Sequence, residues 1–188
     1  RKQAYAQGFG LYGLSEYYSA FGEPEALDRA RSLYRTLEDK FYDPQFGGYL
    51  EALDRDWSEI EDQRLSDKDA NAPKTMNTHL HILEPYSNLY RVDPSTELRD
   101  RLESLTRLFL HKIINPGTGH FDLFFARDWW RQSDIHSYGH DIEGAWLLHE
   151  AAELIGNPGL TRKVELASEK LVKVTLKEGT DHDGSLFN

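Results

Sequence analysis

The chain has 188 residues, carries a formal net charge of −10 and contains no cysteine. Without cysteine there is no disulfide framework and no thiolate metal site, and without a clustered block of Lys and Arg a nucleic-acid partner is excluded. The sequence has no run of about 18 apolar residues and no signal-peptide pattern, so we predict a globular protein with no membrane partner and a cytoplasmic location.

One unit of a helix, a short break, a second helix and a Gly-containing hairpin occurs three times along the chain. The first helices are predicted at residues 2–21, 74–92 and 139–155, and the second helices at 24–40, 95–113 and 158–176. A Pro lies near the first turn of each second helix, where its missing N–H is tolerated. The hairpins follow at 42–49, 115–121 and 181–187.

The second helix of each unit is amphipathic. In the first two units its apolar stripes consist of Ala26, Ala30, Leu33, Leu37 and Phe41, and of Leu98, Leu102, Leu105 and Phe109. Such a stripe is typical of a helix that covers a core with one face and meets water with the other. The more apolar or aromatic first helices are therefore expected to form an inner layer and the second helices an outer layer.

Stacked helix pairs form an open solenoid or a closed toroid. An (α/α)6 toroid needs six pairs, whereas this sequence contains three, begins within a predicted helix and ends within a predicted hairpin. We therefore predict an all-α fold that is part of an (α/α)6 barrel with short β-hairpins between the pairs. The domain prediction is one incomplete toroid over 1–188, with repeats at about 1–73, 74–138 and 139–188.

The first segment that could carry chemistry lies in the second unit, at residues 74–84. Asn77 and His81 are four residues apart on a helix, and Glu84 follows three residues later, so the three share a face. His79 and His81 point in different directions and do not form a helical metal chelate, so we predict no metal here. The alternative for His81 is a core histidine bonded to a backbone group.

The second segment covers residues 137–148. His140, Glu143 and Trp146 follow one helical stripe, and Ser137 or Asp141 could cap the start of that helix. A histidine beside a carboxylate can serve as a general base, and an aromatic ring offers a sugar an apolar face. The alternative is a helix-start histidine beside a core tryptophan.

The remaining histidines are predicted to be surface or structural residues, with His136 the first candidate for an exception; they are His111, His120, His136, His149 and His182. The sequence contains neither a phosphate-binding Gly-rich loop nor a G-x-S-x-G motif. Acyl transfer and phosphoryl transfer are therefore excluded.

The runs Lys74-Thr75-Met76-Asn77-Thr78-His79-Leu80-His81-Ile82-Leu83-Glu84 and Ser137-Tyr138-Gly139-His140-Asp141-Ile142-Glu143 resemble the cellobiose 2-epimerase branch of the N-acylglucosamine 2-epimerase superfamily. The resemblance runs along essentially the whole chain. It implies part of a longer (α/α)6 barrel that epimerises the reducing-end glucose of β-linked disaccharides at C2, without a cofactor. The implied reaction removes the C2 proton, passes through a cis-enediolate and returns a proton to the other face.

The resemblance also implies catalytic roles for two residues. His140 matches one of a pair of proton-transferring histidines, and His81 matches a histidine that assists ring opening. The partner histidine, an arginine that stabilises the enediolate and further pocket tryptophans belong to parts of the family pattern that this sequence does not contain.

The implied substrate-binding residues lie on the three inner helices. Asn77 matches an amide that contacts the intermediate, Glu143 a carboxylate that orients histidine or binds hydroxyls, and Trp146 an aromatic of the pocket wall. Tyr5 is a further candidate for the sugar site. Gly144 stands where the family pattern has a slightly larger residue, so we expect free space beside it.

Several alternatives stay open from the sequence. One is an epimerase or isomerase of the same superfamily that acts on a monosaccharide, such as N-acylglucosamine or mannose. A glycoside hydrolase on the same toroid would need two carboxylates across the cleavage point. The third is a non-catalytic carbohydrate-binding or assembly module. Half a ring exposes apolar edges, so self-association through them is also predicted.

Overall fold

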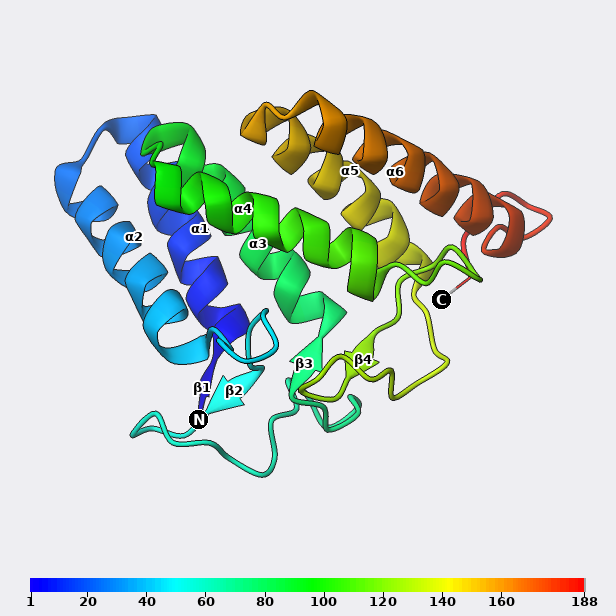
Figure 1. Ribbon diagram of the computed structural model, residues 1–188, viewed down its shortest axis with the longest axis horizontal. Helices are drawn as coiled ribbons and strands as arrows, with labels where there is room; N and C mark the ends of the chain where they lie inside the picture. The colour runs from blue at the N-terminus through cyan, green and yellow to red at the C-terminus, as the bar shows by residue number, and fades with distance from the viewer. Residues whose placement is uncertain (188) are drawn as a thin grey trace.

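The computed structural model describes residues 1–187, in which six α-helices form three consecutive antiparallel pairs (Figure 1). The pairs are α1 (Ala4–Phe21) with α2 (Pro24–Thr36), α3 (Met76–Val92) with α4 (Thr96–Leu108), and α5 (Tyr138–Ile155) with α6 (Pro158–Glu178). Helix α3 packs against both α1 and α5, so the first helices form the inner layer as predicted. None of the helices described is long and apolar enough to cross a membrane.

The outer helices bury the stripes that their sequences predict. Most side chains of both stripes are buried in the core, and Leu33 is partly buried against it. Helices α2 and α4 do not continue as α-helix to their predicted ends: each finishes in one wider π-helical turn, η1 (Leu37–Phe41) and η2 (Phe109–Ile113). There the hydrogen bonds run five residues back, as from Tyr42 N–H to the Leu37 carbonyl.

Short strands join the repeats at one end of the molecule (Figure 1). Strand β1 (Lys2–Gln3) pairs antiparallel with β2 (Ala52–Leu53), and β3 (Lys74–Thr75) pairs antiparallel with β4 (Phe124–Phe125). The prediction that the chain begins inside a helix is therefore wrong, because Lys2 and Gln3 are extended and paired with β2. The three predicted hairpins form, each closed by a single bridge: Tyr42–Tyr49, Ile114–Phe121 and Thr180–Leu186.

A buried lysine fastens the first hairpin to the second repeat. Lys74 Nζ is completely buried and donates hydrogen bonds to Asp43 Oδ2 at 2.9 Å and to the carbonyls of Gly47 and Arg127. The Arg127 side chain reaches the same carboxylate at 3.1 Å. Burial raises the pKa of Asp43, but the hydrogen bonds from Arg127 and Lys74 outweigh it and bring that pKa to about 2. The ion pair fixes β3, which leads directly into α3.

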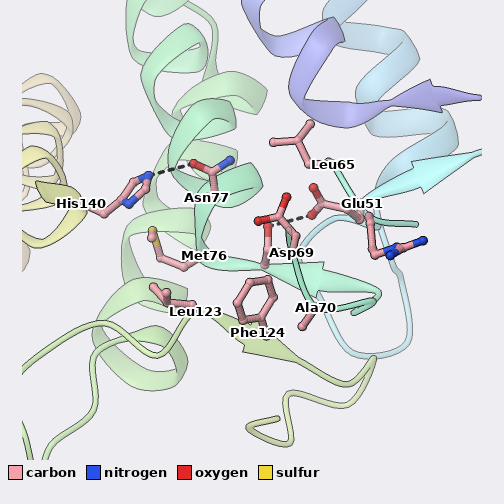
Figure 2. Close-up of a pocket in the computed structure, with 11 residues that line it drawn as sticks. Glu51, Leu65, Asp69, Ala70, Met76, Asn77, Leu123, Phe124 and His140 are labelled. Atoms are coloured by element: carbon pink, nitrogen blue, oxygen red, sulfur yellow. Dashed lines mark hydrogen bonds between the residues drawn. The ribbon is translucent and has the colours of Figure 1, made fainter. Parts of the chain in front are cut away.

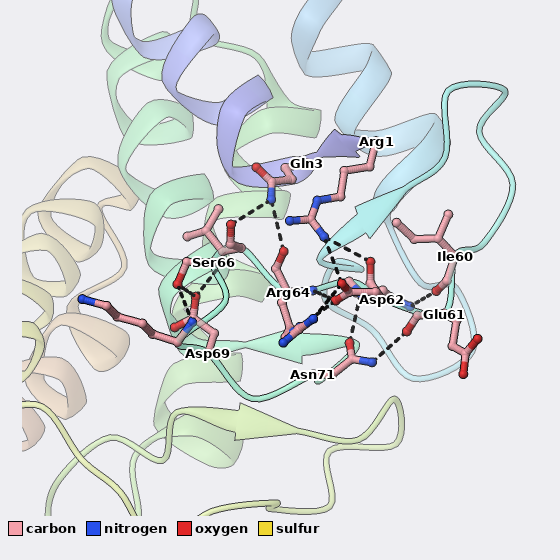
Figure 3. A network of polar contacts seen from close by, with 12 residues as sticks. Arg1, Gln3, Ile60, Glu61, Asp62, Arg64, Ser66, Asp69 and Asn71 are labelled. Carbon is pink, nitrogen blue, oxygen red and sulfur yellow. Dashed lines mark hydrogen bonds and ion pairs between the residues drawn. The ribbon is translucent and has the colours of Figure 1, made fainter.

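The connection between β2 and β3 lies against the start of the chain (Figure 3). Arg1 pairs with Asp62 at 3.6 Å, and Gln3 Nε2 donates to the carbonyls of Arg64 and Leu65. Within the connection, Asn71 donates to the Glu61 carbonyl. These contacts hold the segment against Arg1 and Gln3.

Candidate functional site

A pocket of about 160 Å³ lies where α3 and α5 begin (Figure 2). Helix α3 contributes Met76 and Asn77, and α5 contributes His140. The β2–β3 connection and the strands close the other sides, through Glu51, Arg64, Leu65, Asp69, Ala70, Thr75, Leu123 and Phe124. The two segments singled out in the sequence therefore meet at one cavity, although 63 residues separate Asn77 from His140.

His140 is held on both sides of its ring. Ser137 is the N-cap of α5, so its hydroxyl accepts from the His140 backbone N–H, and its Oγ also lies 2.9 Å from Nδ1. On the other side, Nε2 lies 3.1 Å from Asn77 Oδ1. Of the two caps that the sequence offered, Ser137 is the one used. The alternative joined a helix-start histidine to a core tryptophan, and its second half is wrong, because Trp146 is 53% exposed.

His81 lies one turn further along α3 and is bonded to a carboxylate. Its Nδ1 is 3.2 Å from Glu84 Oε2. The ring of Tyr5 meets it edge-on at 5.2 Å, and the ring of Phe9 lies at 5.0 Å. Two side chains from α1 and one from α3 thus hold the imidazole.

A glycine allows α1 to come this close to α3. A Cβ on Gly8 would lie 2.4 Å from the His81 carbonyl oxygen. Pro85 stands four residues after His81 inside the helix and has no N–H to donate to that carbonyl. Pro85 has no N–H and Gly8 has no side chain, and both face the His81 carbonyl. Helix α1 therefore comes close enough to α3 for the Tyr5 ring to contact His81.

The core histidine in this segment is His79. It is fully buried, its Nδ1 lies 2.6 Å from the Thr75 carbonyl, and its Nε2 accepts the Tyr49 backbone N–H at 2.9 Å. Burial lowers its pKa to about 4. The backbone-bonded alternative considered for His81 therefore describes His79, and the prediction that the two histidines point in different directions is confirmed.

A buried carboxylate in the pocket wall was missed by the sequence interpretation. Glu51 is 1% exposed, and its two oxygens accept the hydroxyls of Thr75 and Thr78, each at 2.7 Å. Thr75 is the N-cap of α3, so Glu51 sits at the positive end of that helix. The sequence does contain one indication of a buried carboxylate: Glu51 is the single acidic residue in the otherwise apolar run from Tyr49 to Leu53.

Changing Glu51 to Gln is expected to remove one contribution to the dependence of stability on pH. Burial raises the pKa of Glu51 to about 7, so between about pH 4.3 and 7 this carboxyl binds more protons in the folded state than in the unfolded state. Its contribution to the free energy of unfolding therefore falls as the pH rises through this window, by on the order of 3 kcal/mol. The contribution of His79, whose pKa burial lowers to about 4, has the opposite sign. Urea unfolding at pH 5 and pH 8 measures the difference.

The exposed Glu61 offers a matched control, since Glu61→Gln should leave the pH dependence as it is in the unmodified protein. The same change in stability between pH 5 and pH 8 for Glu51→Gln and the unmodified protein would contradict this role of the buried carboxylate.

Of the predicted catalytic and sugar-binding residues, His140 and Asn77 line this pocket, whereas His81, Tyr5, Glu143 and Trp146 are not part of its lining. Trp146 is 53% exposed and lines a groove between α5 and α6, together with His149. Glu143 is half-buried on α5, one turn after His140. The expected free space beside Gly144 is filled, because a Cβ there would lie 2.3 Å from the Phe121 ring.

The comparisons with known proteins cover the whole chain. The sequence model of the N-acylglucosamine 2-epimerase (GlcNAc 2-epimerase) family matches residues 1–188. A cellobiose 2-epimerase of Bacteroides fragilis is 50% identical over 187 residues, which cover 100% of this chain and 47% of that protein. A cellobiose 2-epimerase of Dictyoglomus turgidum is 37% identical over 188 residues, covering 100% of this chain and 48% of that protein.

A solved structure confirms the fold class. The cellobiose 2-epimerase of Bacillus thermoamylovorans superposes with a TM-score of 0.93 at 39% sequence identity, covering 98% of this chain and 47% of that one. The chain is thus all-α and forms part of an (α/α)6 barrel. It spans about half the length of the relatives that it matches.

Proposed function

The chain belongs to the N-acylglucosamine 2-epimerase family, and we propose that the protein containing it epimerises the reducing-end glucose of β-linked disaccharides at C2, turning cellobiose into glucosyl-mannose. The observation that supports this most is the contact between His140 and Asn77 in one pocket. It combines an imidazole that can take up or release a proton with an amide that can hold sugar oxygens.

In the proposed reaction His140 moves the C2 proton. The Ser137 hydroxyl can donate to Nδ1 or accept from it, so the imidazole is held in either neutral tautomer. In the contact with Asn77 Oδ1 it is Nε2–H that donates. In the proposed complex the Asn77 side chain turns toward the sugar and the imidazole proton lies on Nδ1, beside Ser137 Oγ. Nε2 then takes the proton from C2, and the C–H electron pair forms the enediolate. A proton returned to the opposite face yields the epimer, with no net oxidation or reduction. Asn77 then contacts the intermediate.

His81 is proposed to assist ring opening. Glu84 fixes the proton on Nδ1, which leaves Nε2 as a proton acceptor toward the sugar. Tyr5, packed on this imidazole, is proposed to contact the sugar ring. Glu143 and Trp146 remain proposed as an orienting or hydroxyl-binding carboxylate and an aromatic wall.

Return of a proton to the opposite face requires a second acid/base group. The resemblance assigns that role to a histidine in the part of the family pattern that these 188 residues do not contain. The proposed activity is therefore that of the whole protein, in a cytoplasmic setting. We also propose self-association through apolar edges. The exposed aromatic side chains on α1 and α5, the first and last helices of the inner layer, include Phe9, Tyr17, Phe21 and Trp146.

Product analysis by proton NMR tests the substrate. The purified full-length protein is incubated separately with cellobiose, N-acetylglucosamine and mannose. We expect new mannose-type anomeric signals from cellobiose. Conversion of only a monosaccharide would contradict the disaccharide proposal, and conversion of none would contradict the epimerase proposal.

A further inference from the structure

Three possible metal ligands gather outside the pocket, where the second hairpin meets the end of α6. His120 comes from the hairpin, His136 from the segment before α5, and Glu178 is the last residue of α6. One ligand atom from each lies within 4.8 Å of the others. The sequence interpretation had assigned both histidines to surface or structural roles, with His136 the first candidate for an exception.

The ring of His120 is oriented by a buried carboxylate. Its Nδ1 lies 2.6 Å from Asp141 Oδ2, while Asp141 Oδ1 accepts the backbone N–H of Phe121 at 2.9 Å. Since the carboxylate accepts, the Nδ1 proton is in place, and Nε2 points toward Glu178. A histidine that donates its other ring N–H to a carboxylate is the usual arrangement behind a metal ligand.

The contact between His120 and Glu178 calls for a positive charge between them. His120 is 1% exposed, and its Nε2 lies 3.3 Å from Glu178 Oε2. Without a cation, two lone pairs would face each other, so either a proton or a metal ion belongs there. Tetrahedral zinc with bonds of about 2.0–2.1 Å places its ligand atoms about 3.4 Å apart, which this pair already matches.

His136 is the third candidate ligand. Its ring stacks on that of His120 with centroids 4.1 Å apart and planes inclined by 8°. The nitrogen lone pairs of two stacked rings run nearly parallel, so His136 has to rotate out of the stack to share an ion with His120 and Glu178. His136 is half-buried and Glu178 is exposed, so both can turn toward an ion, and the open side leaves room for water.

We propose that His120, His136 and Glu178 form a site for a transition-metal dication such as Zn²⁺, with water as the fourth ligand. Two imidazoles and one carboxylate suit zinc, and do not suit magnesium or calcium, which prefer oxygen ligands. The ion would tie the hairpin and α6 to Asp141, the residue next to His140. It would thereby fix the first turn of α5 without contacting the sugar.

Zinc titration by calorimetry tests the proposal, with the tag-free full-length protein after removal of metals. We expect one equivalent of Zn²⁺ to bind, and His136→Ala and Glu178→Gln each to weaken that binding at least about tenfold. The exposed His111 and His182 provide controls, since His111→Ala and His182→Ala should leave the affinity unchanged. Cobalt(II) titration, followed by its visible absorption, reports tetrahedral ligation independently of activity.

Circular dichroism in EDTA shows whether each variant is folded, so that lost binding is not confused with unfolding. Failure of the unmodified protein to bind Zn²⁺ would overturn the proposal and leave a proton between His120 and Glu178. Zinc binding that survives both ligand variants would also overturn it.

Discussion

Replacing His140 by asparagine is expected to lower the rate of epimer formation by about 10²–10⁴-fold, the contribution of a positioned acid/base group. Asparagine places its amide where Nδ1 lies and can keep the contact with Ser137, but it cannot take up a proton from C2. The loss should therefore appear in kcat, with KM much less changed. Initial rates with cellobiose, measured on the full-length protein over a range of concentrations, separate the two constants.

His149 is the matched control because it lies on the same helix but lines the groove between α5 and α6. Its side chain is half-buried, and its Nδ1 lies 3.8 Å from Glu153 Oε2. His149→Asn should retain nearly full kcat. A loss below about tenfold for His140→Asn, or an equal loss in both variants, would contradict the assignment of proton transfer to His140.

Replacing Lys74 by methionine should destabilise the protein by about 3–5 kcal/mol, the range found when one partner of a buried ion pair is removed. Methionine fills much of the space but leaves Asp43 and the carbonyls of Gly47 and Arg127 without the ammonium that they share. Only the Arg127 side chain, itself partly exposed, still neutralises the carboxylate. Urea unfolding gives the free energy directly.

Two further variants test whether the loss of stability in Lys74→Met comes from the ion pair. The exposed Lys68 serves as control, since Lys68→Met should change the free energy of unfolding by less than about 0.5 kcal/mol. Adding Asp43→Asn to Lys74→Met should recover part of the loss, because the buried site then holds no carboxylate charge that has lost its ammonium partner. A loss below about 1 kcal/mol for Lys74→Met alone would show that the ion pair is not what anchors β3.

The sequence predicted the layers well because helical periodicity is a strong local signal. The stripe from Leu98 to Phe109 is buried as expected, and Ser137 caps α5. The two-residue strands were not predicted, since pairs such as Lys2–Gln3 with Ala52–Leu53 depend on contacts about 50 residues apart. Periodicity within a segment carries no information about such partners.

In the candidate site, too, the contacts within one helix could be predicted from the sequence and those between repeats could not. Helical spacing placed Asn77, His81 and Glu84 on one face, and the bond from His81 to Glu84 follows from it. Spacing alone could not tell whether His79 or His81 is the structural histidine. His79 is structural because its Nε2 accepts the backbone N–H of Tyr49, which lies in the first hairpin. Glu51 was missed for the same reason: its two threonine partners belong to a different repeat unit.

Deuterium incorporation at C2 tests whether the reaction proceeds by proton transfer at this pocket. The full-length protein is incubated with cellobiose in D2O, and the reducing-end C2 position is followed by proton NMR in both substrate and product. We expect the epimer to carry deuterium at C2, recovered cellobiose to gain it as well, and His140→Asn to suppress both. An epimer that keeps its original C2 hydrogen would contradict proton transfer to His140.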